Sequence, residues 1–137
     1  MSIDPDRSPN TSARGPDRVN LKAALESFRE PWRPRIIGRF QDSKVQVAKF
    51  SGDFVWHKHE DSDDLFLVLE GHLLIDLPGR TVELTPGELF IVPAGVEHRP
   101  RAQGEVHVLN LEATGTVNTG DAPDPGDLRA PEQQLDA

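Results

Sequence analysis

The chain has 137 residues, a length that fits one domain with a single hydrophobic core. Its formal net charge of −8 at pH 7 argues against a nucleic-acid partner, because nucleic-acid-binding proteins cluster lysine and arginine against phosphates. Without cysteine, any bound metal would have to be held by imidazole and carboxylate groups. No apolar run approaches the roughly 20 residues of a membrane-spanning helix, so we expect a cytoplasmic protein with no membrane partner.

The predicted organisation is one domain, over residues 19–117, between two polar ends. Residues 1–18 are rich in Pro, Ser, Asp and Arg, and residues 118–137 in Pro and acidic side chains, so both ends are predicted to be flexible tails. At the start of the domain, Asn20 can cap a short helix whose apolar residues lie at i, i+3, i+4 and i+7. Pro31 follows and limits the length of this helix.

From residue 35 onward the hydrophobic period changes to two, which predicts a β domain. Short runs rich in Val, Ile, Leu and Phe alternate with turn residues roughly every 8–12 positions. The predicted strands lie near residues 35–40, 44–50, 53–59, 64–69, 72–77, 80–84, 88–93 and 105–112. About eight strands at this spacing favour an all-β sandwich, barrel or jelly roll.

The stretch WHKHEDSDD combines two imidazoles with four carboxylates. Alternation along an extended chain places His57 and His59 on one face. Val55 has the same parity and the next strand is strongly apolar, so we expect both imidazoles to face the interior, where they need partners. Asp64, at the start of that strand, is the candidate carboxylate, and Asp63 is its rival. Imidazole and carboxylate together suit iron, manganese, nickel, zinc or copper.

Two segments resemble sequence motifs of the cupin superfamily. Residues 52–71 (GDFVWHKHEDSDDLFLVLEG) resemble the first motif, with a glycine, a His-x-His pair, an acidic residue and a closing glycine. Residues 87–98 (GELFIVPAGVEH) resemble the second, in which a glycine, a proline, a glycine and a histidine recur at this spacing. The resemblance extends over 35–117 and is to small single-domain bacterial cupins. It implies an all-β fold, a double-stranded β-helix or jelly-roll barrel, to which the short N-terminal helix is added.

The resemblance also implies a metal centre. His57 and His59 match the paired ligands of the first motif, and His98 matches the ligand of the second. Asp64 stands where the family usually has a glutamate, one methylene longer, so the backbone could shift, water could intervene, or three histidines could suffice. The implied cofactor is one divalent transition metal ion: iron, manganese, nickel, zinc or copper.

His107 is a further candidate for a functional role. It shares the parity of Leu109 and Leu111, so it is predicted either to point into the pocket, as a catalytic acid/base or supporting group, or to be a hydrogen-bonded core histidine. His72 follows a turn and is predicted to be exposed.

These features predict a metal-dependent enzyme of the isomerase, lyase or dioxygenase type that acts on a small polar metabolite. The alternative is a non-catalytic cupin that binds a small molecule or acts as a sensor, and a degenerate site with a scaffold role is a third reading. Val106 and Val108, predicted to face outward beside Trp32 and Trp56, offer apolar surface for a homodimer.

Overall fold

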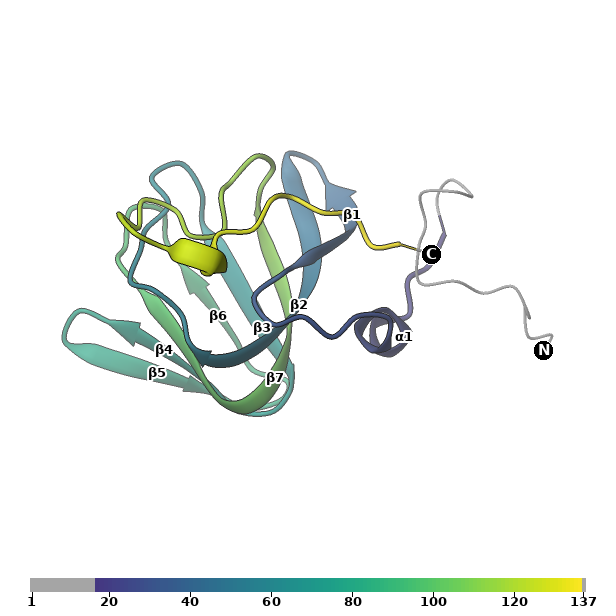
Figure 1. Cartoon of the computed structure of the whole chain (residues 1–137), viewed down its shortest axis with the longest axis horizontal. Coiled ribbons are helices and arrows are strands. Elements are labelled where there is room, and N and C mark those ends of the chain that lie inside the picture. The colour runs from purple at the N-terminus through teal and green to yellow at the C-terminus, as the bar shows by residue number, and fades with distance from the viewer. Residues whose placement is uncertain (1–16, 137) are drawn as a thin grey trace.

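The computed structural model describes residues 17–136 and confirms the all-β jelly-roll barrel (Figure 1). The first sixteen residues of the predicted N-terminal tail lie outside the described range. The strands are β1 (Arg35–Phe40), β2 (Ser43–Asp53), β3 (Asp64–Glu70), β4 (Leu73–Leu77), β5 (Arg80–Leu84), β6 (Leu89–Val92) and β7 (Arg99–Ala113). One helix, α1 (Leu21–Glu26), precedes them, and a 3-10 turn, η1 (Gly126–Leu128), follows. In this described part, neither helix is long and apolar enough to cross a membrane.

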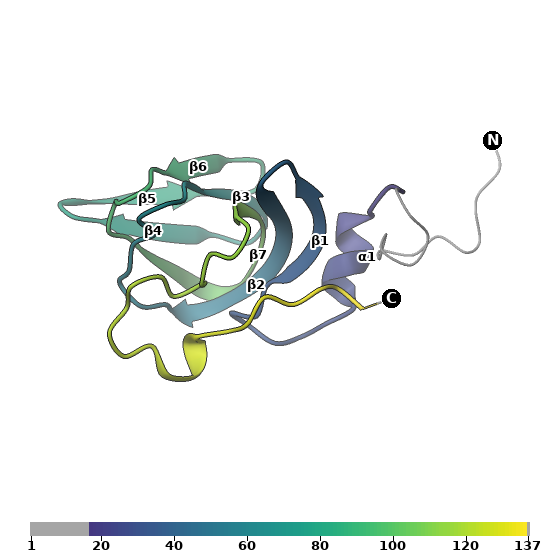
Figure 2. The ribbon, with the colours of Figure 1, turned by 90° about the horizontal axis from the view of Figure 1, so that it is seen from above.

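Strand β7 joins the two sides of the barrel. Its second half lies between β2 and β3, where Val108 pairs with Ala48 on one side and with Val68 on the other. Its first half pairs with β4, where Pro100 lies opposite Ile75, and β4 pairs in turn with β5. All these pairings are antiparallel, and β1 and β6 extend the sheet to the order β1-β2-β7-β3-β6. Figure 2 shows β4, β5 and β6 on one side of the interior and β2 and β7 on the other.

The inner face of β7 has the opposite parity to the one predicted. Val106 and Val108 are fully buried in the barrel core, so they cannot form the predicted dimer surface. Leu109 lies on the outer face, where it packs against a second core. Both faces of β7 carry apolar residues, because one face packs in the barrel core and the other against the second core. Hydrophobic alternation alone therefore could not identify which face points into the barrel.

Helix α1 covers the outer face of the sheet. The side-chain oxygen of Asn20 accepts a hydrogen bond from the backbone N–H of Ala23 at 2.9 Å, which confirms the predicted cap. The apolar side of the helix packs into a small second core. The buried members of this core are Ala24, Leu25, Phe28, Ile37, Val47 and Leu135.

Trp32, between α1 and β1, belongs to the barrel core and not to the surface. Its ring stacks on Phe50, with ring centroids 4.2 Å apart, and on Phe54, at 4.6 Å. The indole N–H donates to the carbonyl of Ser51 at 2.8 Å, which satisfies the polar end of a buried side chain. Trp56, in contrast, is 42% exposed.

The segment from 118 to 136 is part of the domain, and the prediction of a tail beginning at 118 is wrong for this range. In Figure 1 the yellow C-terminal segment crosses the molecule toward β1. The backbone N–H of Ile36 donates to the carbonyl of Gln133 at 2.7 Å, and that of Leu135 donates to the carbonyl of Ile36 at 3.0 Å. A few buried side chains, among them Thr119 and Leu135, anchor a segment whose composition is otherwise polar.

Candidate metal centre

Four side chains predicted as metal ligands converge inside the barrel. They are His57, His59, Asp64 and His98, all buried, and each offers one ligand atom within 4.8 Å of the others. Asp64 is the first residue of β3, whereas the histidines come from the connections that precede β3 and β7.

The two motifs meet through one short backbone contact. The predicted strand over 53–59 does not form beyond Asp53, where β2 ends. Instead, the backbone N–H of His57 donates to the carbonyl of His98 at 3.0 Å, and that of His98 donates to the carbonyl of His57 at 2.9 Å. This isolated antiparallel bridge places the two imidazoles directly opposite each other, with ring centroids 4.3 Å apart.

Backbone carbonyls fix the orientation of two imidazoles. The Nδ1 atom of His57 lies 2.9 Å from the carbonyl oxygen of Val55, and that of His98 lies 2.9 Å from the carbonyl oxygen of Val96. Because a carbonyl oxygen can only accept, each Nδ1 carries the proton and donates it. The lone pair of each ring is therefore on Nε2, the atom available to a metal ion.

The cluster contains buried polar atoms without partners. The Nε2 atoms of His59 and His98 are buried and form no hydrogen bond within the described part of the chain, although Asp64 Oδ2 lies 3.4 Å from the first and 3.6 Å from the second. Such atoms are rare, because a buried polar atom without a hydrogen bond has lost its contact with water and has gained no protein partner. Two donors bound to one ion at roughly 2.0–2.2 Å can be at most about 4.4 Å apart, and both distances lie within that limit. The chemistry of the donor set and these two distances therefore fit a metal ion.

Asp64 is held in place by an amide that the sequence analysis missed. Asn110 on β7 donates its Nδ2 group to Asp64 Oδ1 at 2.6 Å, and Asn110 Oδ1 accepts from Gln46 Nε2 at 2.9 Å. Burial by itself would raise the pKa of the Asp64 carboxyl, but the adjacent imidazoles of His59 and His98, with help from the hydrogen bond from Asn110, hold the pKa below its usual range. Asp64 is therefore a carboxylate, with Oδ2 facing the imidazoles.

His57 is neutral at physiological pH. Burial, together with the nearby charges of His98 and His59, lowers the pKa of His57 to about 4, although its hydrogen bond to Val55 acts in the opposite direction. A neutral imidazole keeps its lone pair, which is the form that binds a metal ion.

Glu112 and Lys44 form a buried ion pair beside the centre, and neither was identified from the sequence. Glu112 Oε1 lies 3.5 Å from Lys44 Nζ, and Glu112 Oε2 lies 4.0 Å from His59 Nε2. Burial and the neighbouring charge of Asp64 raise the pKa of Glu112 well above its ordinary value. The signal that could have located it is the polar pair Asn110 and Glu112 at alternate positions of β7.

The other acidic and histidine candidates lie elsewhere. The side chain of Asp63, the rival of Asp64, accepts a hydrogen bond from the backbone N–H of Ala94 at 2.9 Å. His72 is exposed, as predicted.

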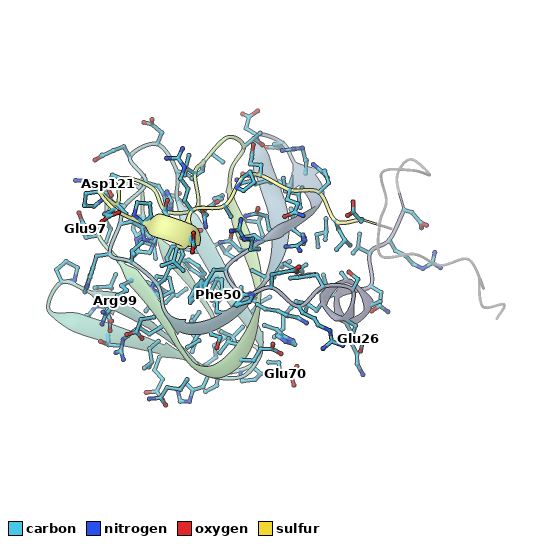
Figure 3. The ribbon with its side chains drawn as sticks, viewed as in Figure 1. Glu26, Phe50, Glu70, Glu97, Arg99 and Asp121 are labelled. Carbon is cyan, nitrogen blue, oxygen red and sulfur yellow. The ribbon has the colours of Figure 1, made fainter. Side chains whose placement is uncertain are left out.

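The predicted inward orientation of His107 is wrong. Its ring lies on the outer face of β7, where Nε2 is 2.9 Å from Glu105 Oε2 and Nδ1 is 3.1 Å from Glu70 Oε2. Figure 3 shows Glu70 at the lower side of the molecule and Asp121, which lines the cavity next to His59, at the opposite end. The structure therefore does not bring His107 to the metal centre.

One end of the centre borders a cavity, and the other is aromatic. The cavity has a volume of about 420 Å³ and is lined by residues of 58–62 and 113–117 with Gly120 and Asp121. His59 is the ligand candidate that lines it. On the inner side, Phe54 meets the ring of His57 edge-on, with centroids 5.2 Å apart.

The segment after β7 lies tightly over the chain that carries His59. Gly120 has a φ of +51°, and a Cβ there would lie 2.2 Å from the carbonyl oxygen of Lys58. The Asp121 side chain also accepts a hydrogen bond from the backbone N–H of Lys58 at 2.8 Å. Gly120 is therefore required for this close approach.

Comparisons with known proteins agree with this geometry. The sequence matches the Cupin_2 family, described as a cupin domain, over residues 44–112. It is 39% identical over 93 residues to the protein YdbB of Bacillus subtilis (strain 168), which is 67% of this chain and 80% of that protein. It is also 30% identical over 90 residues to 3-hydroxyanthranilate 3,4-dioxygenase of Bos taurus, which is 61% of this chain but only 32% of the bovine enzyme.

A solved structure supports the same assignment. The cupin-2 domain containing protein of Shewanella frigidimarina superimposes with a TM-score of 0.68 and 36% sequence identity. This alignment covers 69% of this chain and 93% of the Shewanella chain. With the barrel, both motifs and the family match in agreement, the chain belongs to the cupin family.

Proposed function

We propose that this protein is a metal-dependent cupin in which His57, His59, Asp64 and His98 hold one divalent transition metal ion. The observation that carries the proposal is the convergence of four buried donors, two of which, the Nε2 atoms of His59 and His98, have no hydrogen-bond partner among residues 17–136. Membership of the cupin family supports it, because cupins commonly bind a transition metal. The donor set is compatible with iron, manganese, nickel, zinc and copper.

We further propose that the metal centre is catalytic and acts on a small polar metabolite. When bound, the ion would polarise a carbonyl or hydroxyl oxygen of the substrate. The cavity next to His59 gives such a molecule a place to approach from. Among isomerase, lyase and dioxygenase chemistry, the likeness to a bovine dioxygenase favours testing dioxygenase activity first.

A non-catalytic role in binding or sensing a small molecule is the second candidate. It is favoured by the enclosure of the centre, since His57 is 2% exposed and His98 is 1% exposed. A catalyst needs an open position on the ion, and the burial of these two ligand residues restricts such a position.

The first experiment is elemental analysis of protein purified without chelators or a metal-binding tag. We expect about one transition metal ion per chain, and its loss in the double variant His57→Ala/His59→Ala. The double variant His72→Ala/His107→Ala is the matched control, because it removes two imidazoles outside the centre and should keep the ion. A full complement of metal in the first variant would refute the site assignment.

A second experiment separates the catalytic role from the binding role. Iron-loaded protein is given 3-hydroxyanthranilate, the compound named for the bovine relative, and related small aromatic acids, and oxygen consumption is followed. Consumption that requires both iron and substrate would support catalysis. Tight binding of such a compound without consumption, followed by calorimetry, would favour the binding role.

We also propose that two copies of the chain pair through strand β6, in place of the surface predicted from the sequence. Leu89 and Ile91 are 54% and 47% exposed, and among residues 17–136 β6 pairs with β3 alone. A free edge without charged residues favours pairing with another strand. Sedimentation should give about twice the 15.2 kDa monomer mass, and Ile91→Lys should reduce it to the monomer. Phe40→Lys, at another exposed apolar side chain, is the control that should leave the mass unchanged.

A further inference from the structure

Glu112 lies next to the metal centre on the inner face of β7. Its side chain is buried, and its two carboxylate oxygens face different groups. Oε1 is 3.5 Å from the ammonium group of Lys44, and Oε2 is 4.0 Å from Nε2 of His59. Within residues 17–136, that nitrogen is one of the two buried side-chain N or O atoms without a hydrogen-bond partner.

The distance from Glu112 to His59 is compatible with a shared ion. Two atoms bound to one ion at roughly 2.0–2.2 Å lie at most about 4.4 Å apart, and 4.0 Å is inside this limit. Asp64 Oδ2, at 3.4 Å from the same nitrogen, meets the criterion as well. An ion bound by His59 and Asp64 would therefore have a second carboxylate oxygen within reach.

The charges around the centre also favour a second carboxylate. A divalent ion held by three neutral imidazoles and Asp64 would leave one positive charge in a buried site, which is unfavourable without a partner. Bound to the ion as a carboxylate, Glu112 would neutralise that charge. Lys44 does not depend on Glu112, because its Nζ lies 2.9 Å from Glu132 Oε2 and donates to the carbonyl of Thr116 at 2.8 Å.

We propose that Glu112 is a fifth ligand residue, so that the centre binds a divalent ion with three imidazoles and two carboxylates. The inference rests on the proposed function, namely that His57, His59, Asp64 and His98 bind a metal ion.

The test uses Co²⁺ as the probe, because its visible absorption spectrum depends on the number and type of its ligands. Glu112→Gln keeps the volume of the side chain and removes the carboxylate. We expect the Kd for Co²⁺ to rise at least about 100-fold, and the spectrum of the ion that remains bound to change. Circular dichroism and a thermal melt of the metal-free variant check that the fold is retained.

Glu132→Gln is the matched control, since it removes one carboxylate from Lys44 without touching the centre. It should change the Kd for Co²⁺ by less than about 5-fold and leave the spectrum as in the wild type. This control separates ligation by Glu112 from an indirect electrostatic effect through Lys44.

The outcomes distinguish this inference from the proposed function. A wild-type protein that binds no Co²⁺ would overturn both. A Glu112→Gln protein that binds Co²⁺ with the wild-type spectrum would overturn the role of Glu112 and leave the four-residue site standing. If Glu112→Gln binds no Co²⁺ at all, Glu112→Asp and Glu112→His restore a donor atom; recovery in either supports ligation, and failure in both refutes it.

Discussion

Asn110 donates its side-chain amide to the Oδ1 oxygen of Asp64 at 2.6 Å, and both side chains are buried. The bond occupies one carboxylate oxygen and leaves the other facing His59 and His98. A group that orients a ligand in this way governs metal affinity although it does not touch the ion.

Replacing Asn110 by alanine should therefore weaken metal binding by about 10- to 100-fold. It should also lower the free energy of unfolding of the metal-free protein by about 1–3 kcal/mol, because Gln46 and Asp64 lose their buried partner. Metal titration calorimetry and urea denaturation measure the two effects. An Asn110→Ala protein with wild-type metal affinity would show that Asp64 needs no orienting group.

Metal-free protein should lose stability as the pH falls from about 6.5 to about 4. His57 has a pKa of about 4 in the folded chain, below the value of about 6.5 for an unfolded chain. Between these values the unfolded chain binds a proton that the folded chain does not, so acid favours unfolding, by at most about 3 kcal/mol. Urea unfolding at several pH values should show a flatter profile for His57→Gln than for the exposed control His72→Gln.

Asp76→Asn should lower the free energy of unfolding by about 2 kcal/mol. The buried Asp76 carboxylate accepts two hydrogen bonds each from Arg99 and Arg101, and one from Thr81. Hydrogen bonding with Arg101 above all lowers the pKa of Asp76, outweighing burial. This stabilisation is present above the pKa of about 4 that Asp76 has in the unfolded chain, and it is lost as the pH falls toward the lower pKa of the folded chain. The free energies of unfolding of the variant and of the wild type should therefore converge in acid. A difference in the free energy of unfolding that stays constant down to pH 2 would show that the ion pairs of Asp76 do not stabilise the fold.

The two tryptophans should respond very differently to replacement by alanine. Trp32 is buried between Phe50 and Phe54, and its loss should cost about 3–5 kcal/mol of unfolding free energy. Trp56 is 42% exposed and contacts the guanidinium of Arg99, so its loss should cost less than about 1 kcal/mol. Denaturant unfolding followed by circular dichroism gives both values. Equal costs would mean that Trp32 does not complete the core.

Ending the chain at residue 117 should destabilise the domain by at least about 3 kcal/mol. The truncation removes the buried side chain of Leu135 and the Glu132 carboxylate that pairs with Lys44. Leu135→Ala alone should cost about 2–4 kcal/mol, with the exposed Asp136→Ala as its control. A truncated protein with the same melting temperature as the full chain would support the domain end at residue 117 that the sequence predicted.

Much of the barrel and of the metal centre could be predicted from the sequence, because both depend on local patterns. Turn residues between short apolar runs predicted six of the seven strands within a few residues. The His-x-His pair and the histidine at the end of the second motif predicted the cluster that the structure brings together. These signals lie in short segments and can be recognised without knowing which other parts of the chain each segment contacts.

The errors in the prediction arose where contacts between distant parts of the chain determine the local structure or the orientation of a side chain. His57 and His59 were assigned to a strand, but they lie in an extended connection with a single bridge to His98. His107 was oriented inward because both faces of β7 are apolar, one covered by the barrel core and the other by α1. Glu112 escaped notice because an isolated acid at the end of a strand resembles a solvated one until its neighbours are known.

The position of β7 also sets the order in which the nascent chain can be assembled. Ser43 at the start of β2 pairs with Ala113 at the end of β7, so the main sheet joins distant parts of the chain. Until β7 has left the ribosome, the pairings available among the described strands are β1-β2, β3-β6 and β4-β5. The barrel, and with it the metal centre, is therefore completed after synthesis of β7, and such long-range pairing makes folding slow compared with a helical protein of this size. A stop codon ahead of β7 would yield a chain without a barrel instead of a smaller cupin.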